Sequence, residues 1–467
     1  MVAGQILDVR QLVAAQKSYF KSGATKSYDF RLSQLKKLRQ VLLENEQAIV
    51  KALYDDLHKS SFEAYGTEFS FVLKDLDHTI SSLKGWMKAK KVTTPLFHQL
   101  GSSWIQSEPY GLVYVMAPWN YPFQLLMAPV IGAMAAGNTI IMKPSQSTNH
   151  ICAVIEKMIK DNFSAEYMAV ITSHTDSDIV LEENVDYVFF TGGKRTGIDV
   201  YTKAAKTLTP VTLELGGKSP CFIDESINMN WGIKRIIWGK FTNAGQTCVA
   251  PDYVLIDKKV KAKFLEEAKK VIKEFYGDNP KASKDFGRIV KSSNNKNFKK
   301  LASLLEGMDV VCGGDIDESE NYIAPTILDN VKLTDAIMQD EIFGPILPII
   351  EYSSLDEAIQ IVKNGGKPLA LYIFSENKMY AEKILSETSS GNASINECLM
   401  HVGQFNLPFG GVGDSGIGQY HGKLSFDTFS HAKGVLKKST LSDLKLRFPP
   451  YKESNVNLLK KLIAWLN

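Results

Sequence analysis

The sequence predicts an α/β fold built around a parallel sheet and divided into two or three domains. The alternation of strands and helices predicts the sheet, and the length of the chain predicts the division. Short apolar runs alternate with helix-length segments over residues 112–213. Strict alternation of strand and helix is typical of a parallel sheet covered by helices on both faces. The chain has 467 residues, which exceeds the size at which a single core stops growing, so two or three domains are expected.

Two helical stretches precede the alternating region. From Arg31 to Leu57, apolar residues recur with a 3.6-residue period and charges lie between them, which predicts a helix with one buried face. A second helical stretch runs from about Phe62 to Lys90 and stops before Thr93-Thr94-Pro95.

Five strands and three helices are predicted in the alternating region. The strands are Leu112–Ala117, Thr139–Met142, Ala169–Ile171, Tyr187–Phe190 and Val211–Leu213, and the helices are Phe123–Ala136, Gln146–Asn162 and Arg195–Leu208. In such sheets, ligands bind beyond the carboxyl ends of the strands. Four polar residues fall at or just past strand ends and are expected at one edge of the sheet: Asn120, Lys143, Thr191 and Glu214.

A second α/β region follows from about Gly216 to Cys398. It contains a lysine-rich helix, a polar connector, a strand and the start of another helix, at Lys258–Phe275, Lys291–Lys300, Ile346–Ile350 and Leu355. Glycine-rich loops occupy residues 403–422.

Composition limits the partners and the compartment. The chain carries 54 Lys and Arg against 51 Asp and Glu, a net charge of +3 that argues against nucleic acid as the main partner. Five irregularly spaced cysteines and an N-terminus without a secretory signal predict a reducing, cytoplasmic location. No uncharged apolar run reaches the ~18 residues that a membrane span needs.

One cysteine lies in a distinctive setting. Cys248 follows small and polar residues in the stretch Phe241–Pro251, with no CxxC partner and no histidine at ligand spacing. This pattern is typical of a nucleophile in an accessible turn. A small buried side chain is nevertheless the commoner role for a single cysteine, so other motifs must decide.

The stretch closely resembles the active-site cysteine motif of the aldehyde dehydrogenase superfamily, and its form resembles the class 3, fatty-aldehyde-type branch. Four more motifs of that family occur in the family's order: Pro118–Pro122, Leu213–Lys218, Glu341–Pro345 and Leu407–Gly413. The resemblance therefore covers nearly the whole chain.

The resemblance implies a Rossmann-type parallel-sheet cofactor domain, an α/β catalytic domain and a small β bridging element. The expected boundaries are residues 1–98 and 112–211 for the cofactor domain, 212–403 for the catalytic domain, 99–111 and 404–440 for the bridging element, and 441–467 for a C-terminal tail. Segments near 99–111 and 424–436 would pair across a homodimer.

Oxidation of an aldehyde to an acid requires a nucleophile, donors for an oxyanion, a hydride acceptor and a base that activates water. The resemblance assigns Cys248 as the nucleophile, Asn120 and the Cys248 backbone N–H as the donors, and Glu214 as the base. Two alternatives stay open: Asn120 caps the following helix, and Glu214 is either desolvated or solvated at the sheet edge.

The expected cofactor is NAD or NADP. Thr191, Gly192 and Gly193 follow a strand and open a helix, whose N-terminal amides favour anions. They resemble the family's dinucleotide turn, whereas the literal GxGxxG at 411–416 follows no clear strand and is not assigned to the cofactor.

The resemblance assigns further cofactor contacts. Lys143 would bind the adenosine ribose, Leu215 would contact the cofactor, and Glu341 and Phe343 would fix the nicotinamide ribose and pack beside the ring. Gln146 stands where the family commonly has a carboxylate that repels a 2′-phosphate, which predicts use of both NAD and NADP.

Other residues carry weaker signals. The spacings of His401, His421 and His431 fit no metal site, so surface or satisfied histidines are expected and no metal is assigned. Tyr65 and Tyr121 are similar to class 3 tyrosines near the substrate, although either fits a plain core role.

The tail combines Leu458, Leu459, Leu462, Ile463 and Leu466 on one helical face with Lys460, Lys461 and Trp465 alongside. Such a helix is expected to dock on the protein or a dimer partner, or to lie on an anionic membrane.

These observations predict NAD(P)-dependent oxidation of aldehydes, of medium or long aliphatic or aromatic type, to carboxylic acids through a cysteine thiohemiacetal and thioester. The alternative is a cysteine acyltransferase or hydrolase without redox chemistry. That class needs a histidine base beside the thiol, and no histidine accompanies these motifs. An inactive relative is a third hypothesis, against which the presence of Cys248, Glu214 and Asn120 argues.

Overall fold

The computed structural model describes residues 8–98, 100–441, 443 and 447–466. Contacts divide the chain into two compact units. The first comprises the residues up to Trp86 together with Glu108–His431, and the second comprises Met87–Ser107 and the residues from Ala432 onward. The predicted domain boundaries remain a prediction.

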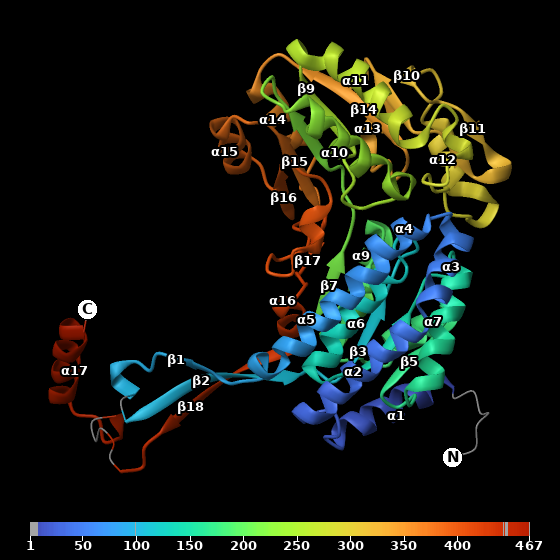
Figure 1. The fold of residues 1–467 in the computed structure, drawn as a ribbon. Coiled ribbons are helices and arrows are strands. Elements are labelled where there is room, and N and C mark those ends of the chain that lie inside the picture. The colour runs from blue at the N-terminus through green and yellow to red at the C-terminus, as the bar shows by residue number, and fades with distance from the viewer. Residues whose placement is uncertain (1–7, 99, 442, 444–446, 467) are drawn as a thin grey trace. The chain divides into compact units, whose positions relative to one another are not determined.

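The first unit contains a six-stranded sheet in the order β17-β7-β6-β3-β4-β5 within the described residues (Figure 1). Neighbouring strands from β7 to β5 run parallel, as predicted, and β17 pairs antiparallel with β7. The strands are β3 Leu112–Met116, β4 Thr139–Lys143, β5 Met168–Val170, β6 Tyr187–Thr191, β7 Val211–Glu214 and β17 Gly416–Ile417.

Helices cover this sheet, and α6 is buried all round, as expected of a helix that is apolar on every face. α6 contacts β3, β4, α2, α5 and α16, whereas α1 contacts β3, β4 and α8, and α9 contacts β6 and β7. These helices are α1 Val9–Lys21, α2 Tyr28–Glu44, α5 Ser70–Trp86, α6 Gln124–Ala136, α7 Asn149–Asn162, α8 His174–Glu182, α9 Lys194–Ala205 and α16 Lys423–Thr428. The sequence pattern did not predict α8.

The predicted helix from Arg31 to Leu57 is wrong as a single element. It is two helices, α2 and α3 Glu46–Leu57, separated at Asn45. The side-chain amide of Asn45 donates to the carbonyl of Val41 at 2.7 Å, which satisfies a carbonyl near the end of α2. Both helices bury apolar residues, so the period continued across the break.

The next predicted helix, Phe62 to Lys90, is also interrupted. It consists of α4 Ser61–Ala64, a π-helical turn η1 Tyr65–Phe69, and α5, which ends at Trp86 rather than Lys90. Lys90 instead begins strand β1 Lys90–Val92. π-helical turns are rare and are frequent at functional sites.

A second sheet of the first unit has seven strands in the order β10-β13-β14-β9-β8-β15-β16 within the described residues. Its strands are β8 Pro220–Ile223, β9 Tyr253–Asp257, β10 Asp309–Cys312, β13 Thr326–Asp329, β14 Ile346–Tyr352, β15 Ala370–Phe374 and β16 Asn392–Ile395, and a small pair is formed by β11 Ile316–Asp317 and β12 Tyr322–Ile323. Neighbouring strands run parallel except β10 and β13.

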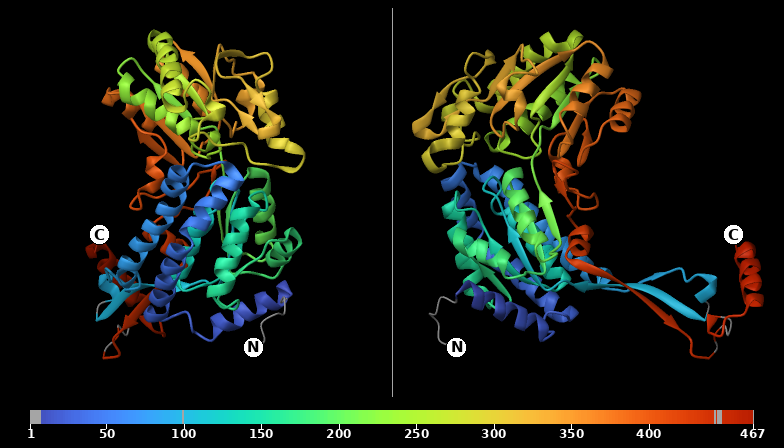
Figure 2. Two further views of the ribbon diagram at one scale, coloured as in Figure 1. Left: turned by 45° about the vertical axis from the view of Figure 1, so that its right-hand side comes forward. Right: turned by 180° about the vertical axis from the view of Figure 1, so that it is seen from behind.

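Helices and short turns accompany the second sheet (Figure 2). They are α10 Met229–Phe241, η3 Thr242–Gly245, α11 Lys258–Tyr276, η4 Pro280–Ala282, η5 Ser293–Asn295, α12 Lys296–Ser303, η6 Glu318–Glu320, α13 Ala336–Gln339, α14 Leu355–Asn364, α15 Lys378–Glu387 and η7 Met400–Gly403. The predicted polar connector Lys291–Lys300 is therefore partly helical.

The second unit is built on a three-stranded sheet in the order β1-β2-β18, with β2 at Gly101–Pro109 and β18 at Ser430–Lys438. The segments predicted to pair across a homodimer thus contribute neighbouring strands within one chain, and residues 423–428 are helical. The unit also contains η2 Leu96–His98 and α17 Glu453–Leu466. No helix in the described part of the chain has the length and apolar character to span a membrane.

Candidate active site

The carboxyl ends of β3, β4, β6 and β7 bring the four predicted polar residues to one edge of the six-stranded sheet. Thr191 lies opposite Glu214 in the β6–β7 register, and Lys143 lies opposite Met116, the last residue of β3. Asn120 lies in the loop that follows β3. The placement agrees with the prediction from the strand pattern.

Cys248 follows α10 in a loop with an unusual backbone. Asn243, Ala244 and Gly245 all have positive φ, at 54°, 51° and 72°. Gly245 is required here because an added Cβ would also lie 2.3 Å from the carbonyl oxygen of Gly344. Such conformations persist only where surrounding contacts enforce them.

Hydrogen bonds enforce the backbone of this loop. Asn120 Nδ2 donates to the carbonyl of Gln246 at 3.0 Å, and Asn243 Nδ2 donates to the carbonyl of Asn120 at 2.8 Å. Gln246 Nε2 donates to the carbonyl of Arg288 at 2.9 Å, and Tyr121 Oη shares a 2.8 Å hydrogen bond with Thr247 Oγ1. The side chain of Asn120 makes no capping bond to α6, so the helix-cap alternative is wrong.

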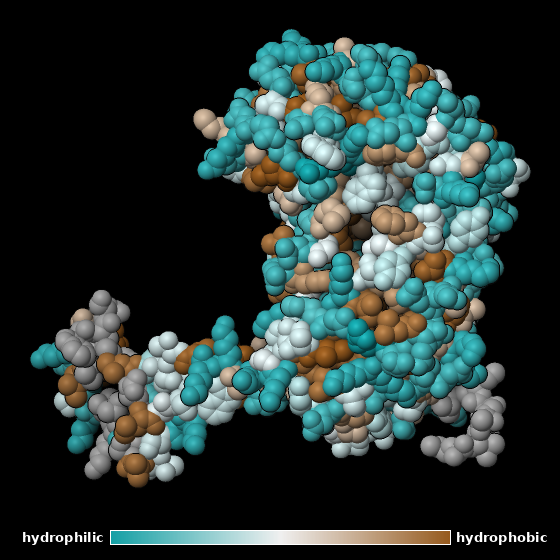
Figure 3. Space-filling model, in the orientation of Figure 1, coloured by the Kyte–Doolittle hydropathy of each residue, from teal (hydrophilic) through white to brown (hydrophobic). Residues whose placement is uncertain are grey.

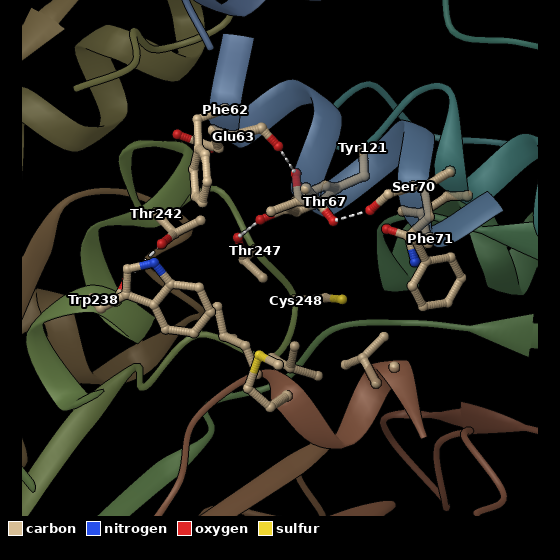
Figure 4. A pocket seen from close by; sticks show the side chains of 18 of the residues that line it. Phe62, Glu63, Thr67, Ser70, Phe71, Tyr121, Trp238, Thr242, Thr247 and Cys248 are labelled. Carbon is tan, nitrogen blue, oxygen red and sulfur yellow. Dashed lines mark hydrogen bonds between the residues drawn. The ribbon is translucent and has the colours of Figure 1, made fainter. Parts of the chain in front are cut away.

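The side chain of Cys248 points into a cavity of about 690 Å³ (Figure 4). Most large side chains that line the cavity are apolar or aromatic: Phe62, Phe71, Leu125, Trp238, Phe275, Met400, Phe405 and Phe409. On the face drawn in Figure 3, brown and pale residues border a hollow beside the segment that carries α4. The thiol therefore faces a space suited to a largely apolar molecule.

The surroundings of Cys248 favour the neutral thiol. Burial raises the pKa of Cys248, and the carboxylates of Glu341 and Glu214 raise it further, whereas the backbone N–H groups of Cys248 and Val249 act in the opposite direction. A thiol in this state needs a base to become a nucleophile.

The position of Glu214 allowed a desolvated or a solvated carboxylate, and the structure shows the desolvated one. Its residue is 2% exposed, and neither carboxylate oxygen has a hydrogen-bond partner. Burial raises the pKa of Glu214 well above its ordinary value. Such a shift brings a carboxyl group toward the range that suits a general base at neutral pH.

The turn at Thr191–Gly193 fits a dinucleotide phosphate. Gly193 is the N-cap residue of the 12-residue helix α9, and the Gly192 N–H donates to the Glu214 carbonyl at 3.0 Å. The buried hydroxyl of Thr191 lacks a partner, so it is available to a ligand. Gly197 lets α9 approach the sheet, because an added Cβ would lie 2.7 Å from Leu215 Cδ2.

The remaining predicted cofactor residues flank this turn. Lys143 is 5% exposed, donates to the Pro144 carbonyl at 3.1 Å, and has a pKa lowered by burial. Gln146 is exposed. Lys143 is buried and Gln146, three residues later, is exposed, an arrangement that suits contact of Lys143 with a ribose at the sheet edge.

Glu341 and Phe343 approach from the second sheet. An added Cβ on Gly216 would lie 2.0 Å from Glu341 Oε2, so the carboxyl group rests on the glycine pair after β7. Burial, with Asp252 nearby, raises the pKa of Glu341 to about 8. Phe343 has a φ of 55° and packs edge-on against Trp119, with ring centroids 5.3 Å apart.

Comparisons with known proteins agree with this arrangement. The aldehyde dehydrogenase family matches residues 2–435. The chain belongs to the aldehyde dehydrogenase family. It is 48% identical to 4,4′-diaponeurosporen-aldehyde dehydrogenase of Staphylococcus aureus, covering 95% of this chain and 97% of the relative. It is 42% identical to the dimeric NADP-preferring aldehyde dehydrogenase of Canis lupus familiaris, covering 95% and 98%.

A solved structure extends the likeness to the fold. The substrate-bound state of Staphylococcus aureus AldH superimposes with a TM-score of 0.95 at 46% identity, covering 98% of this chain and 100% of that chain. The protein is thus an NAD(P)-dependent aldehyde dehydrogenase that uses NAD or NADP. The predicted family and fold are confirmed.

The acyltransferase or hydrolase alternative is not favoured for this aldehyde dehydrogenase. No histidine is among the described residues that line the Cys248 cavity. His401 is instead half-buried and His421 is buried, the ring nitrogens of both lack partners, and burial lowers their pKa to about 4 and about 3. The expectation of surface or satisfied histidines is therefore wrong for His401 and His421. It is right for His431, which is exposed.

The two predicted tyrosines differ in position. Tyr121 is 7% exposed and lines the cavity, but Tyr65 is 41% exposed and lines a neighbouring pocket. Tyr65 therefore lies neither in the core nor on the Cys248 cavity.

The described residues contain no cluster of three or more His, Cys, Asp or Glu arranged for a metal.

Sequence reasoning missed a buried ion pair. Lys59 and Glu68 have fully buried side chains, and Lys59 Nζ lies 2.5 Å from Glu68 Oε1 and 2.9 Å from the Asn120 carbonyl oxygen. The other carboxylate oxygen of Glu68 accepts the N–H groups of Phe123 and Gln124, at 2.9 and 3.2 Å. No local pattern marks this pair, because Glu68 lies in the unpredicted π-helical turn.

Proposed function

We propose that this aldehyde dehydrogenase oxidises medium- to long-chain aliphatic or aromatic aldehydes, with Cys248 as nucleophile, Asn120 as oxyanion donor and Glu214 as base. The observation that carries the proposal is the projection of Cys248 into a largely apolar cavity, beside a loop that Asn120 holds, with the unpartnered carboxyl of Glu214 close enough to affect the thiol.

The first step is attack of the Cys248 sulfur on the aldehyde carbon, with loss of the thiol proton to a base. The carbonyl oxygen becomes an oxyanion of the thiohemiacetal. Asn120 Nδ2 uses one N–H on the Gln246 carbonyl, and its second N–H is available to that oxygen. The Cys248 backbone N–H supplies the other donor, in a site whose dipoles are already oriented.

Bound NAD or NADP supplies the acceptor for the hydride that leaves the tetrahedral carbon. Thr191, Gly192 and Gly193 would hold its phosphates, Lys143 the adenosine ribose, Leu215 the adjoining surface, and Glu341 and Phe343 the nicotinamide end. The resulting thioester is hydrolysed by a water whose proton passes to Glu214. Burial raises the pKa of Glu214, which makes it a stronger base than an ordinary carboxylate.

A panel of aldehydes of graded chain length, assayed through the absorbance of reduced cofactor, tests the substrate class. The expected result is a kcat/KM that rises with apolar chain length until the cavity is filled. Substitution Cys248→Ser should abolish the signal. Equal kcat/KM for short and long aldehydes contradicts the substrate class, and parent-rate activity of Cys248→Ser contradicts the nucleophile.

We also propose that the enzyme accepts both NAD and NADP. Gln146 is exposed and uncharged at the site expected near the adenosine ribose, so no carboxylate there opposes a 2′-phosphate. A kcat/KM ratio between the two cofactors of a thousandfold in favour of NAD contradicts this proposal.

Homodimer formation is a further proposal. The canine relative is named as dimeric. In this chain, β18 is a nine-residue edge strand of the three-stranded sheet, and edge strands offer unpaired backbone groups to another chain. Light scattering of the purified protein measures the mass directly.

The C-terminal helix α17 exposes Val456, Leu458, Leu459 and Ile463. The predicted apolar face also includes Leu462 and Leu466, which lie outside the described side chains, as does Trp465. We propose that this face packs on protein rather than on a membrane, a choice that co-sedimentation with anionic vesicles tests.

All five cysteines are free, which supports a cytoplasmic location, to be checked by cell fractionation.

A further inference from the structure

Glu63 links the cavity wall to the backbone that precedes the nucleophile. Its Oε1 accepts the N–H of Asn243 at 2.8 Å, across 180 positions of sequence. Asn243 is the first of the three residues with positive φ. Glu63 also lines the cavity into which Cys248 points, and Figure 4 shows both side chains in the same view of that cavity.

The element that carries Glu63 is fixed at both ends. Ser60 caps α4 through Oγ, which accepts the Glu63 N–H, and the Thr67 hydroxyl donates to the Glu63 carbonyl at 2.7 Å. The buried pair of Lys59 and Glu68 brackets the segment and contacts the Asn120 loop. The same short segment therefore holds both the loop of the oxyanion donor and the loop of the nucleophile.

The double contact comes from two adjoining elements. Glu63 lies in α4, and Glu68 lies five residues later in the π-helical turn η1. In this chain, Glu68 reaches the N–H groups after Asn120 and Glu63 reaches the N–H of Asn243. Side chains of α4 and η1 thus bind backbone N–H groups in the loops of Asn120 and Cys248.

We propose that Glu63 is a positioning residue of this dehydrogenase, which holds the left-handed Asn243–Gly245 backbone and thereby places Cys248 for attack. The inference rests on the proposed role of Cys248. Other bonds to the loop come from Asn120 and Arg288, so loss of Glu63 loosens the loop without unfolding it. Small misplacements of reacting atoms reduce turnover strongly while leaving substrate binding largely intact.

Several charged and titratable groups face Glu63: Lys59, Glu68, Asp285, Tyr121 and Tyr276. Burial raises the pKa of Glu63 to about 7, and Lys59 and the Asn243 N–H act in the opposite direction. Ionised Glu63 accepts the Asn243 N–H more strongly than the protonated form. The kcat of the parent should therefore rise as pH increases through about 7, because Glu63 ionises. This contribution adds to that of the general base.

The test compares Glu63→Ala with Glu63→Gln. The alanine variant loses the acceptor, and its kcat should fall about tenfold with KM changed less than threefold. The glutamine variant keeps an amide oxygen in place of the carboxylate, so its kcat should recover to within about threefold of the parent and lack the pH component due to Glu63. Glu357→Ala, which removes a similar bond to the Ser353 N–H in exposed α14, is the matched control and should leave kcat unchanged.

Hydrogen exchange separates this inference from the proposed function, because it needs neither aldehyde nor cofactor. The Asn243 amide should exchange faster in Glu63→Ala and not in Glu63→Gln, while amides of β9 stay protected in both. An unchanged Asn243 exchange rate, a kcat of Glu63→Ala within twofold of the parent, or a glutamine variant as slow as alanine overturns the inference. Absence of cofactor reduction by the parent with any aldehyde would instead overturn the proposed function.

Discussion

The side-chain amide of Asn120 lies 3.0 Å from the main-chain oxygen of Gln246, two residues before Cys248. This bond crosses from the loop after β3 to the loop after α10. It ties the amide to the backbone of the Cys248 loop, and it uses only one of the two N–H groups. A donor fixed in this way needs little reorganisation when negative charge develops on the substrate oxygen.

Replacing Asn120 by alanine should reduce kcat by about 10²–10³-fold, the cost typical of losing one oxyanion donor. Steady-state rates with a saturating aldehyde provide the measurement. Asn162→Ala is the matched control, because Asn162 Nδ2 also donates to a main-chain carbonyl, that of Met158, but lies on α7. A rate for Asn120→Ala close to that of Asn162→Ala would remove the oxyanion role.

Replacing Glu214 by glutamine should uncouple the two halves of the reaction. With its carboxyl gone, hydrolysis of the thioester loses its base, and steady-state turnover should fall about 10²-fold or more. Rapid mixing should still show a burst of reduced cofactor, about one per site, if another group accepts the Cys248 proton. Because the pKa of Glu214 is raised in the folded protein, parent turnover should decline as pH falls through that raised value.

Two results would contradict this role of Glu214. One is a Glu214→Gln variant that turns over at the parent rate, and the other is a variant that retains the same pH dependence of turnover. Glu376→Gln, an exposed substitution in the loop before α15, controls for loss of a carboxylate elsewhere.

Sequence patterns predicted the parts of this site that follow from strand order. Thr191 and Glu214 end β6 and β7, Asn120 lies in the loop after β3, and parallel strands bring their carboxyl ends to one edge. The link from Glu63 to Asn243 was not predictable in this way, because the two residues share no element. A hydrophobic period reports which face is buried and not which distant backbone group a carboxylate reaches.

The errors in the helical regions have the same origin. Asn45 interrupts a helix without interrupting the apolar period. The π-helical turn at Tyr65–Phe69 inserts a wider turn into the next helix, and the residue composition of the segment does not reveal it. His421 belongs with these errors, since a stacked contact with Phe409 at 5.1 Å places it in the interior.

Replacing Gln146 by glutamate should shift cofactor choice toward NAD. A new carboxylate near the adenosine ribose repels the 2′-phosphate of NADP and leaves NAD little affected, so the NAD to NADP ratio of kcat/KM should rise about tenfold. Raising the salt concentration should reduce the effect, because Gln146 is exposed. Gln360→Glu, on the exposed side of α14, should leave the ratio unchanged, and an unchanged ratio in Gln146→Glu would place the ribose elsewhere.

Asp75 offers a test of stability rather than catalysis. It is 1% exposed on α5, neither carboxylate oxygen has a partner, and burial raises its pKa to about 7. The folded protein therefore binds a proton that the unfolded chain releases near its ordinary pKa of 3.8. Between these two values, the free energy of unfolding should fall as pH rises, and above about pH 7 the loss is complete.

Asp75→Asn removes this ionisation at nearly constant volume. From pH 5 to pH 8, the free energy of unfolding of the variant should gain about 2 to 3 kcal/mol relative to the parent. Urea unfolding at both pH values measures the change. Thr79→Val, also buried on α5 but without a titratable group, should shift stability by the same amount at both. If the difference between Asp75→Asn and the parent is independent of pH, Asp75 is not protonated in the folded protein and a water or neighbouring dipole must stabilise its charge.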